Sequence, residues 1–118
     1  MSVSPEFKEF LIEQMAGFGA VTIRSMFGGA GVYHNSLMFA LIDDDMLYLK
    51  ADESTKSAFE AEGLTQFVYL AKGGKKMEMG YWHTPSRCLD EPDEMAKWCR
   101  EAYDVALKAA TKKPKKKS

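Results

Sequence analysis

Short apolar runs and apolar–polar alternation fill the first half of the chain, a pattern typical of β-strands. Residues that favour strands make up four segments, Val21–Phe27, Gly31–His34, Leu37–Ile42 and Met46–Lys50. The last three are separated by Asn35-Ser36 and Asp43-Asp44-Asp45, residue types that tolerate the left-handed backbone of tight hairpin turns. The pattern predicts an antiparallel meander, and it leaves open whether the first two segments form one bent strand or two strands.

Helical spacing appears on both sides of this meander. Ser4-Pro5-Glu6 combines a capping hydroxyl, a proline and an early acid, which predicts a helix start. A second, short helix is expected to begin at Asp52 or Ser54 and to end at Gly63, since glycine commonly follows a helix. The last helix begins within residues 90–93 and carries an apolar stripe. This stripe consists of Met95, Trp98, Cys99, Ala102, Ala106 and Ala109.

Two further strands, Gln66–Leu70 and Met77–Trp82, flank a loop of glycines and lysines, so they predict a hairpin. With the first two segments counted as one strand, the order of elements is α-β(3)-α-β(2)-α. Helices that are separated from antiparallel strands predict an α+β fold. We expect a two-layer sandwich, an antiparallel sheet with helices on one face.

The meander also holds the most specific sequence motif. Met26-Phe27-Gly28-Gly29-Ala30-Gly31-Val32-Tyr33 is followed by Met38-Phe39-Ala40-Leu41-Ile42-Asp43, by Leu47-Tyr48-Leu49-Lys50-Ala51-Asp52 and by Met79-Gly80-Tyr81-Trp82. As an ordered set, these motifs strongly resemble the N-terminal domain of the TfoX/Sxy family, over nearly the whole chain except its last residues. The positions that match the family motif are Arg24, Met26, Phe27, Gly28, Gly29 and Gly31.

This resemblance implies a non-enzymatic regulatory domain that acts through protein–protein contacts, with a transcription regulator or a second copy of the chain as partner. It also implies a role in the transcriptional control of bacterial competence, the uptake of external DNA. The better-known competence regulators carry a second, helical domain after this one, whereas the present sequence stops after the first. We therefore expect a stand-alone copy either to have lost the competence role or to serve another regulator.

The composition is that of an ordinary globular domain. Of the 118 residues, 46% are hydrophobic and 28% are charged. The sequence contains no apolar run of the ~20 residues that span a bilayer, and its first residues lack the features of a secretion signal. Two cysteines in such a context predict reduced thiols, a cytoplasmic location and no membrane association.

The net charge of −1 conceals two parts of opposite sign. Residues 1–111 hold 11 basic and 17 acidic side chains, a net charge of −6. The basic excess is confined to the end of the chain, at Lys112, Lys113, Lys115, Lys116 and Lys117. We predict a folded domain over residues 1–110 and a disordered tail over 111–118. One alternative function is weak, non-specific nucleic-acid binding through this tail, because the domain itself is acidic.

We expect no catalytic, cofactor or metal site. A strand rather than a helix follows Gly28–Gly31, which disfavours a phosphate-binding loop. Cys88 and Cys99 lie outside the usual spacing of structural zinc ligands. Cys88 and His83 are the best candidates for nucleophilic chemistry, although a partly buried loop cysteine is the simpler interpretation. A small-molecule-binding domain is a further alternative, but it would need convergent polar groups that no spacing here requires.

Arg24 is a lone basic residue in an apolar strand. A buried guanidinium needs a partner, so the favoured interpretation is a salt bridge to an acid such as Glu13 or Asp90. The alternative is contact with an acidic partner protein. The motif glycines are expected to supply a positive φ, a bulge or room for a neighbouring backbone.

The segment 37–42 is apolar at every position, so both of its faces need cover. Strict alternation places the odd-numbered residues on one face and Met38, Ala40 and Ile42 on the other. Since single-striped helices cover one face, we predict that Met38, Ala40 and Ile42 form a contact surface for a partner protein or a second copy. The competing interpretation is that side chains of neighbouring strands or loops cover this face.

Overall fold

The computed structural model describes residues 3–26, 29–70 and 76–112, which form helices and one sheet. The helices are α1 (Pro5–Gln14), α2 (Lys56–Ala61), α3 (Arg87–Asp90) and α4 (Pro92–Lys112). The strands are β1 (Thr22–Met26), β2 (Gly29–His34), β3 (Leu37–Asp43), β4 (Met46–Lys50), β5 (Gln66–Leu70) and β6 (Lys76–His83).

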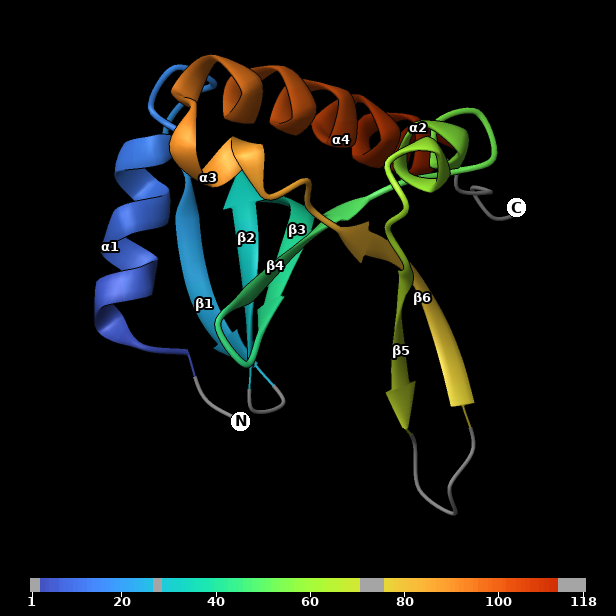
Figure 1. The fold of residues 1–118 in the computed structure, drawn as a ribbon, viewed down its shortest axis with the longest axis horizontal. Coiled ribbons are helices and arrows are strands. Elements are labelled where there is room, and N and C mark those ends of the chain that lie inside the picture. Colours follow the sequence, from blue (N-terminus) through green and yellow to red (C-terminus); the bar gives the residue numbers. More distant parts are fainter. Residues whose placement is uncertain (1–2, 27–28, 71–75, 113–118) are drawn as a thin grey trace.

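The strands form one antiparallel sheet in the order β1-β2-β3-β4-β6-β5. Figure 1 shows α4, in orange to red, running across the top of the sheet, and the β5–β6 hairpin extending away from the other strands. The predicted α+β fold is confirmed. Its order is corrected in two places, because β1 and β2 are separate strands and the short α3 precedes the last helix.

Left-handed residues form the two tight turns of the meander. Asn35 and Ser36 have φ values of 52° and 67°, and Asp44 and Asp45 have values of 54° and 57°. Two consecutive residues at positive φ are characteristic of type I′ hairpin turns, which match the twist of the flanking strands. The turn residues predicted from the sequence therefore set the pairing of β2, β3 and β4.

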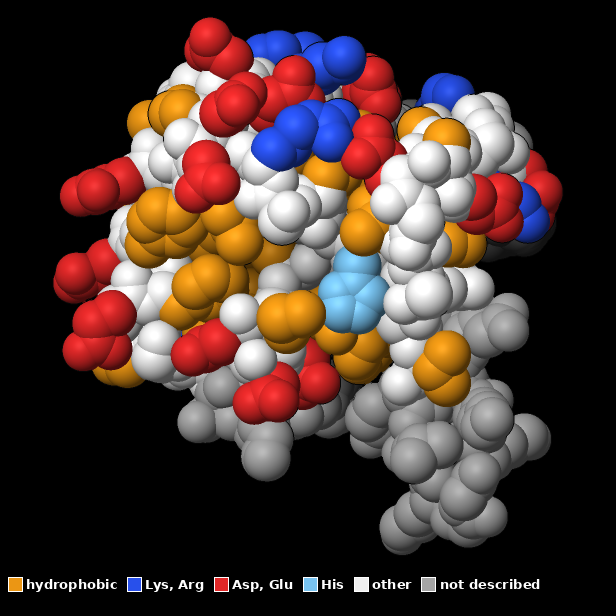
Figure 2. All heavy atoms as spheres, in the orientation of Figure 1, with side chains coloured by type: hydrophobic (Ala, Val, Ile, Leu, Met, Phe, Trp, Pro, Cys, Tyr) orange, Lys and Arg blue, Asp and Glu red, His pale blue; other side chains and the backbone are white. Residues whose placement is uncertain are grey.

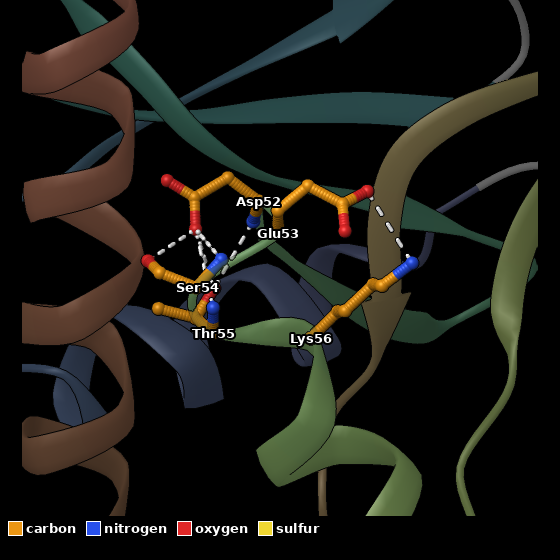
Figure 3. A network of polar contacts seen from close by, with 5 residues as sticks. All are labelled: Asp52, Glu53, Ser54, Thr55 and Lys56. Carbon is orange, nitrogen blue, oxygen red and sulfur yellow. Dashed lines mark hydrogen bonds and ion pairs between the residues drawn. The ribbon is translucent and has the colours of Figure 1, made fainter.

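Side-chain hydrogen bonds shape the chain at the start of α1 and in the turn before α2, which begins at Lys56 after Thr55 rather than at the predicted Asp52 or Ser54. The Phe7 amide donates a hydrogen bond to Ser4 Oγ at 3.1 Å, at the predicted start of α1. Before α2, Asp52 Oδ1 accepts hydrogen bonds from the amides of Ser54 and Thr55 at 3.0 and 3.2 Å. In return, the Asp52 amide donates to Thr55 Oγ1 at 3.0 Å (Figure 3). This reciprocal network fixes the turn between β4 and α2.

One large apolar core lies between the sheet and the helices. All four described helices contribute to it, through residues such as Leu11, Phe59, Cys88 and Trp98. On the sheet side, one row of paired residues spans four strands, and its side chains all belong to the same core. This row consists of Val32, Ala40, Leu49 and Trp82. The helices therefore pack on one face of the sheet. The opposite face is called the outer face below.

The helix α4 buries most of the stripe predicted for it. Ala109 is exposed, however, and Val105 is buried. No helix in the described part of the chain is both long and apolar enough to cross a membrane. The helix runs to Lys112, two residues beyond the predicted domain end at residue 110. The other tail lysines, Lys113, Lys115, Lys116 and Lys117, lie outside the described residues.

Candidate interaction surface

A β-bulge in β3 determines which side chains share a face. Val32 of β2 pairs with Ala40, whereas the next residue, Tyr33, pairs with Met38. The residue between these two partners, Phe39, is therefore an extra residue in β3. Such a residue interrupts the alternation of side chains between the two faces of a strand.

The bulge corrects the predicted contact surface. Ala40 and Ile42 lie in the main core, 0% and 1% exposed, because the extra residue turns them toward the helices. Met38 instead packs with Leu41 on the outer face, although strict alternation placed these two residues on opposite faces. The prediction that Met38, Ala40 and Ile42 share a contact surface is therefore wrong. For Met38 alone, a contact role stays a prediction.

A second, smaller apolar cluster lies on the outer face. Leu41, Tyr48 and Tyr81 form it, and the partly buried Met38 and Phe67 pack against it. The rings of Tyr48 and Phe67 are 4.8 Å apart between centroids. Because Leu41, Tyr48 and Tyr81 are only 7–8% exposed, side chains of neighbouring strands cover much of this face. The accessible chemistry of the outer face therefore comes from the partly exposed residues around the cluster.

Cross-strand pairing aligns one row of residues across the outer face. From β1 to β6, the paired residues are Arg24, Gly31, Leu41, Tyr48 and His83. The rings of Tyr48 and His83 lie 4.5 Å apart between centroids. Two positions of the family motif, Arg24 and Gly31, are thus brought opposite each other and placed in line with the aromatic cluster.

Two cations of the outer face lie over tyrosine rings. The guanidinium carbon of Arg24 is 5.3 Å from the centre of the Tyr33 ring, and Lys50 Nζ is 5.0 Å from the centre of the Tyr81 ring. The negative face of an aromatic ring attracts a cation in this position. Within the described residues, neither cation has a carboxylate at salt-bridge distance. Their charges are therefore available to an external group.

The position of Arg24 also corrects the sequence-based interpretation. The predicted salt bridge to Glu13 or Asp90 is not formed among the described residues. Arg24 lies on the edge strand β1 and is exposed, so water solvates its charge and no buried partner is needed. Arg87, by contrast, is held by two glutamates at 2.8 and 3.1 Å.

Tyr48 and Tyr81, the two buried tyrosines of the outer face, remain neutral at neutral pH. Burial raises the pKa of Tyr81 to about 12, with a smaller contribution from the nearby Tyr33 phenol. Burial also raises the pKa of Tyr48, helped by the negative charges of Asp43 and Asp44. A protonated phenol can donate a hydrogen bond to an anion. The charge beside the cluster therefore comes from side chains other than these phenols.

Gly29 of the family motif is required for the close approach of two strands. A Cβ at this position would overlap the carbonyl oxygen of Ile42 on β3, so the predicted room for a neighbouring backbone is confirmed here. Gly31 lies inside β2, opposite Arg24. The remaining motif positions are the last residue of β1, Met26, and two residues outside the described part of the chain, Phe27 and Gly28.

The candidate nucleophile is poorly placed for catalysis. Cys88 is fully buried in α3 against the main core, whereas His83 packs against Tyr48 at the outer face. Burial raises the pKa of Cys88 to about 11 and that of Cys99 to about 12, so both thiols stay protonated and are weak nucleophiles. Within the described residues, no group of three or more His, Cys, Asp and Glu side chains is placed to hold a metal ion.

An open groove of about 410 Å³ lies between α4 and the turn before α2. Apart from Thr55, its lining residues belong to α4: Glu101, Asp104, Val105, Leu107 and Lys108. Its polar groups therefore come mainly from one side of the groove. In typical small-molecule sites, by contrast, polar groups converge on an enclosed volume. The outer face is the better candidate site.

The fold and the outer face define a small α+β domain that presents tyrosines and cations on the face of its sheet opposite the helices. Residues 13–106 match the family model of the TfoX N-terminal domain, and the chain belongs to this family. A stretch of 54 residues is 35% identical to the DNA transformation protein TfoX1 of Aliivibrio fischeri (strain ATCC 700601 / ES114). The matched stretch covers 46% of this chain and 26% of that protein. The chain thus matches about a quarter of the relative's length.

Sequence reasoning found part of this surface and missed the rest. It selected Arg24, Gly31 and Met38, which all lie on the outer face or in its paired row. It missed Lys50 and Tyr81, whose contact joins β4 to β6. Alternation in β4 places Lys50 on the face opposite Leu47 and Leu49, so the sequence pattern could have assigned Lys50 to the outer face. The pairing of β4 with β6, however, was not readable from either segment alone.

Proposed function

We propose that this chain is a cytoplasmic, non-enzymatic regulatory domain that acts through protein–protein contacts in the control of DNA-uptake competence. The observation that carries the proposal is the outer face, where an aromatic cluster lies beside two cations that have no carboxylate at salt-bridge distance among the described residues. The name of the Aliivibrio fischeri relative supports the link to DNA transformation. Since the match covers about a quarter of that protein, applying its role to this chain is part of the proposal.

The charge distribution favours a protein partner over direct nucleic-acid binding by the domain. Residues 1–111 carry a net charge of −6, and phosphate neutralisation supplies most non-specific affinity for nucleic acids. On the face shown in Figure 2, acidic side chains spread over the α1 side and the lower edge, and at the top near α4 they are mixed with Lys and Arg. An acidic surface of this kind repels a phosphate backbone.

A second candidate function rests on the five lysines in the last seven residues. This segment would hold nucleic acid weakly and without sequence preference, as a tether for a domain that contacts a protein. Its signature is an affinity for duplex DNA that falls steeply with salt. Removal of residues 112–118 would abolish that affinity, whereas substitutions on the outer face would leave it unchanged.

Deletion of the gene in the source bacterium tests the proposed function. We expect transformation frequency and the transcripts of DNA-uptake genes to fall at least tenfold, and the wild-type chain to restore both. A variant with Arg24→Glu and Lys50→Glu should fail to restore them at equal protein level, whereas Lys97→Glu with Arg100→Glu on the exposed side of α4 should succeed. Unchanged transformation and transcripts in the deletion strain would contradict the competence role.

A further inference from the structure

We propose that the outer face binds an extended acidic segment of a partner protein, with Arg24 and Lys50 as the residues that recognise its carboxylates. This inference rests on the proposed protein-interaction function and adds the chemistry of the partner. It also assigns a role to the arginine of the family motif.

Each of these cations is oriented by the ring beneath it. The side chains of Arg24 and Lys50 lie over Tyr33 and Tyr81 at 5.3 and 5.0 Å, so part of their rotamer freedom is already lost before a ligand arrives. Preorganisation of this kind lowers the entropic cost of binding. The guanidinium can hold a carboxylate through two parallel hydrogen bonds, whereas the ammonium acts as a point charge.

The spacing of the two cations predicts the spacing of the acids. Arg24 is on β1 and Lys50 is on β4, three strand spacings away. Lys50 also lies two residues along β4 from Tyr48, the residue in the paired row of Arg24, so the two backbone positions are about 16 Å apart at the usual strand spacing and rise. An extended chain advances about 3.3 Å per residue, so two acidic residues roughly five positions apart would reach both cations. Between them lie Gly31, which has no side chain, and the apolar Met38 and Leu41. These residues favour an apolar residue between the two acids.

Nucleic acid fits this surface less well than an acidic peptide. Two cations neutralise about two phosphates, which is a small contribution to nucleic-acid affinity. Single-stranded binders stack bases on accessible aromatic rings, whereas the rings of Tyr48 and Tyr81 are 7% exposed. A second copy of the chain is also disfavoured, since a two-fold contact through this face would bring like charges together.

Selection from a random 12-residue peptide library, with the full chain as bait, tests this inference. We expect the enriched peptides to carry two Asp or Glu residues about five positions apart with an apolar residue between them. The affinity of the tightest peptide should fall at least tenfold for Arg24→Gln with Lys50→Gln, and it should weaken as salt is raised. The matched control, Lys97→Gln with Arg100→Gln on α4, should bind within twofold of wild type.

Several outcomes would overturn the inference. Peptides without an acidic bias, equal binding by the Arg24→Gln/Lys50→Gln variant, or a selection without binders would each contradict it. Peptides that bind independently of these cations would be compatible with the proposed protein-interaction function. They would contradict only the assignment of the binding site to Arg24 and Lys50. A thymidine 20-mer that binds more tightly than any peptide, and loses affinity in the double variant, would assign the face to nucleic acid. A dimer in sedimentation equilibrium that the double variant abolishes would assign it to a second copy.

Discussion

Gly29 and Gly31 belong to the same strand and the same family motif, yet they act differently. Gly29 allows the backbone of β2 to approach β3, because any Cβ there would overlap the Ile42 carbonyl oxygen. Gly31 lies opposite Arg24 in the sheet, so its missing side chain leaves the arginine without a direct cross-strand neighbour of any size. One glycine thus supports the fold and the other shapes the proposed binding surface.

Substitution of Gly29 tests the role of close approach. Gly29→Ala should destabilise the domain by about 1–3 kcal/mol, the usual cost of forcing extra volume into packed structure. Gly17→Ala is the matched control, because a Cβ there would make an ordinary contact of 3.7 Å with Ala96 Cβ. Urea denaturation measures both changes. Equal stability of Gly29→Ala and wild type would show that β2 and β3 do not need this approach.

Asp52 should contribute stability that depends on pH. Hydrogen bonds from Ser54, chiefly from its hydroxyl at 2.7 Å, hold the pKa of Asp52 below its ordinary value. The resulting stabilisation is fully present above the unfolded-state pKa, about 3.9, and is lost as pH falls through the lower folded-state pKa. Asp52→Asn should therefore be less stable than wild type at pH 7, and this difference should shrink below about pH 4.

Thermal melts between pH 7 and pH 2.5 measure this dependence. The control is Glu53→Gln, since the Glu53 side chain is 90% exposed in its ion pair with Lys56, and exposed pairs contribute little. A stability difference between Asp52→Asn and wild type that stays constant down to pH 2.5 would show that the carboxylate charge is not what stabilises the turn.

At the scale of elements, β3 and α3 show how neighbouring structure changes what a segment does. The bulge at Phe39 sends Ala40 and Ile42 into the main core and leaves Met38 on the outer face. Arg87 of α3 reaches Glu62 at the end of α2 and Glu94 in the first turn of α4. The four-residue α3 is thus linked by ion pairs to α4 and to the residue after α2.

The bulge predicts opposite effects for two similar substitutions in β3. Ile42→Lys buries an unpaired cation in the main core and should destabilise the domain by about 4 kcal/mol or unfold it. Met38→Lys places the cation on the partly exposed outer face and should change stability by less than about 1 kcal/mol. Circular-dichroism melts of the two variants measure the contrast. Similar melting points for both would place the two residues on the same face and contradict the bulge.

Removal of the Arg87 side chain should loosen the helices from each other. We expect Arg87→Gln to lower the melting temperature by a few degrees, less so at high salt, because exposed ion pairs contribute under about 1 kcal/mol each. The control Lys56→Gln breaks a pair whose acid is 90% exposed and should have no measurable effect. An unchanged melting temperature for Arg87→Gln would mean that the apolar contacts of α3 suffice to hold it.

At the scale of the whole molecule, the sequence predicted the features that depend on local chemistry. The α+β fold, the Ser4 cap and the left-handed residues of both tight turns follow from neighbouring residues. The bulge could not be predicted, because segment 37–42 is apolar throughout and no alternation marks the extra residue. The short α3 could not be predicted either, because a helix of four residues is too short to show a helical periodicity.

The surroundings of Arg24 likewise depend on the assembled sheet. Its motif position was recognisable, but its contact with Tyr33 requires the register of β1 and β2. The contact of Lys50 with Tyr81 requires β4 to pair with β6 across the intervening α2 and β5. Long-range pairing thus created the two-cation surface, which no single stretch of sequence contained.

The central claim is that a partner protein contacts the outer face, and photo-crosslinking in living cells tests it most directly. A benzoylphenylalanine at position 38 should form a defined protein adduct, which Arg24→Gln with Lys50→Gln should abolish at equal expression. The same probe at position 12, where Ile12 of α1 is 45% exposed, should not form that adduct. An adduct at position 12 but not at position 38, or one at position 38 that persists without the two cations, would contradict the account.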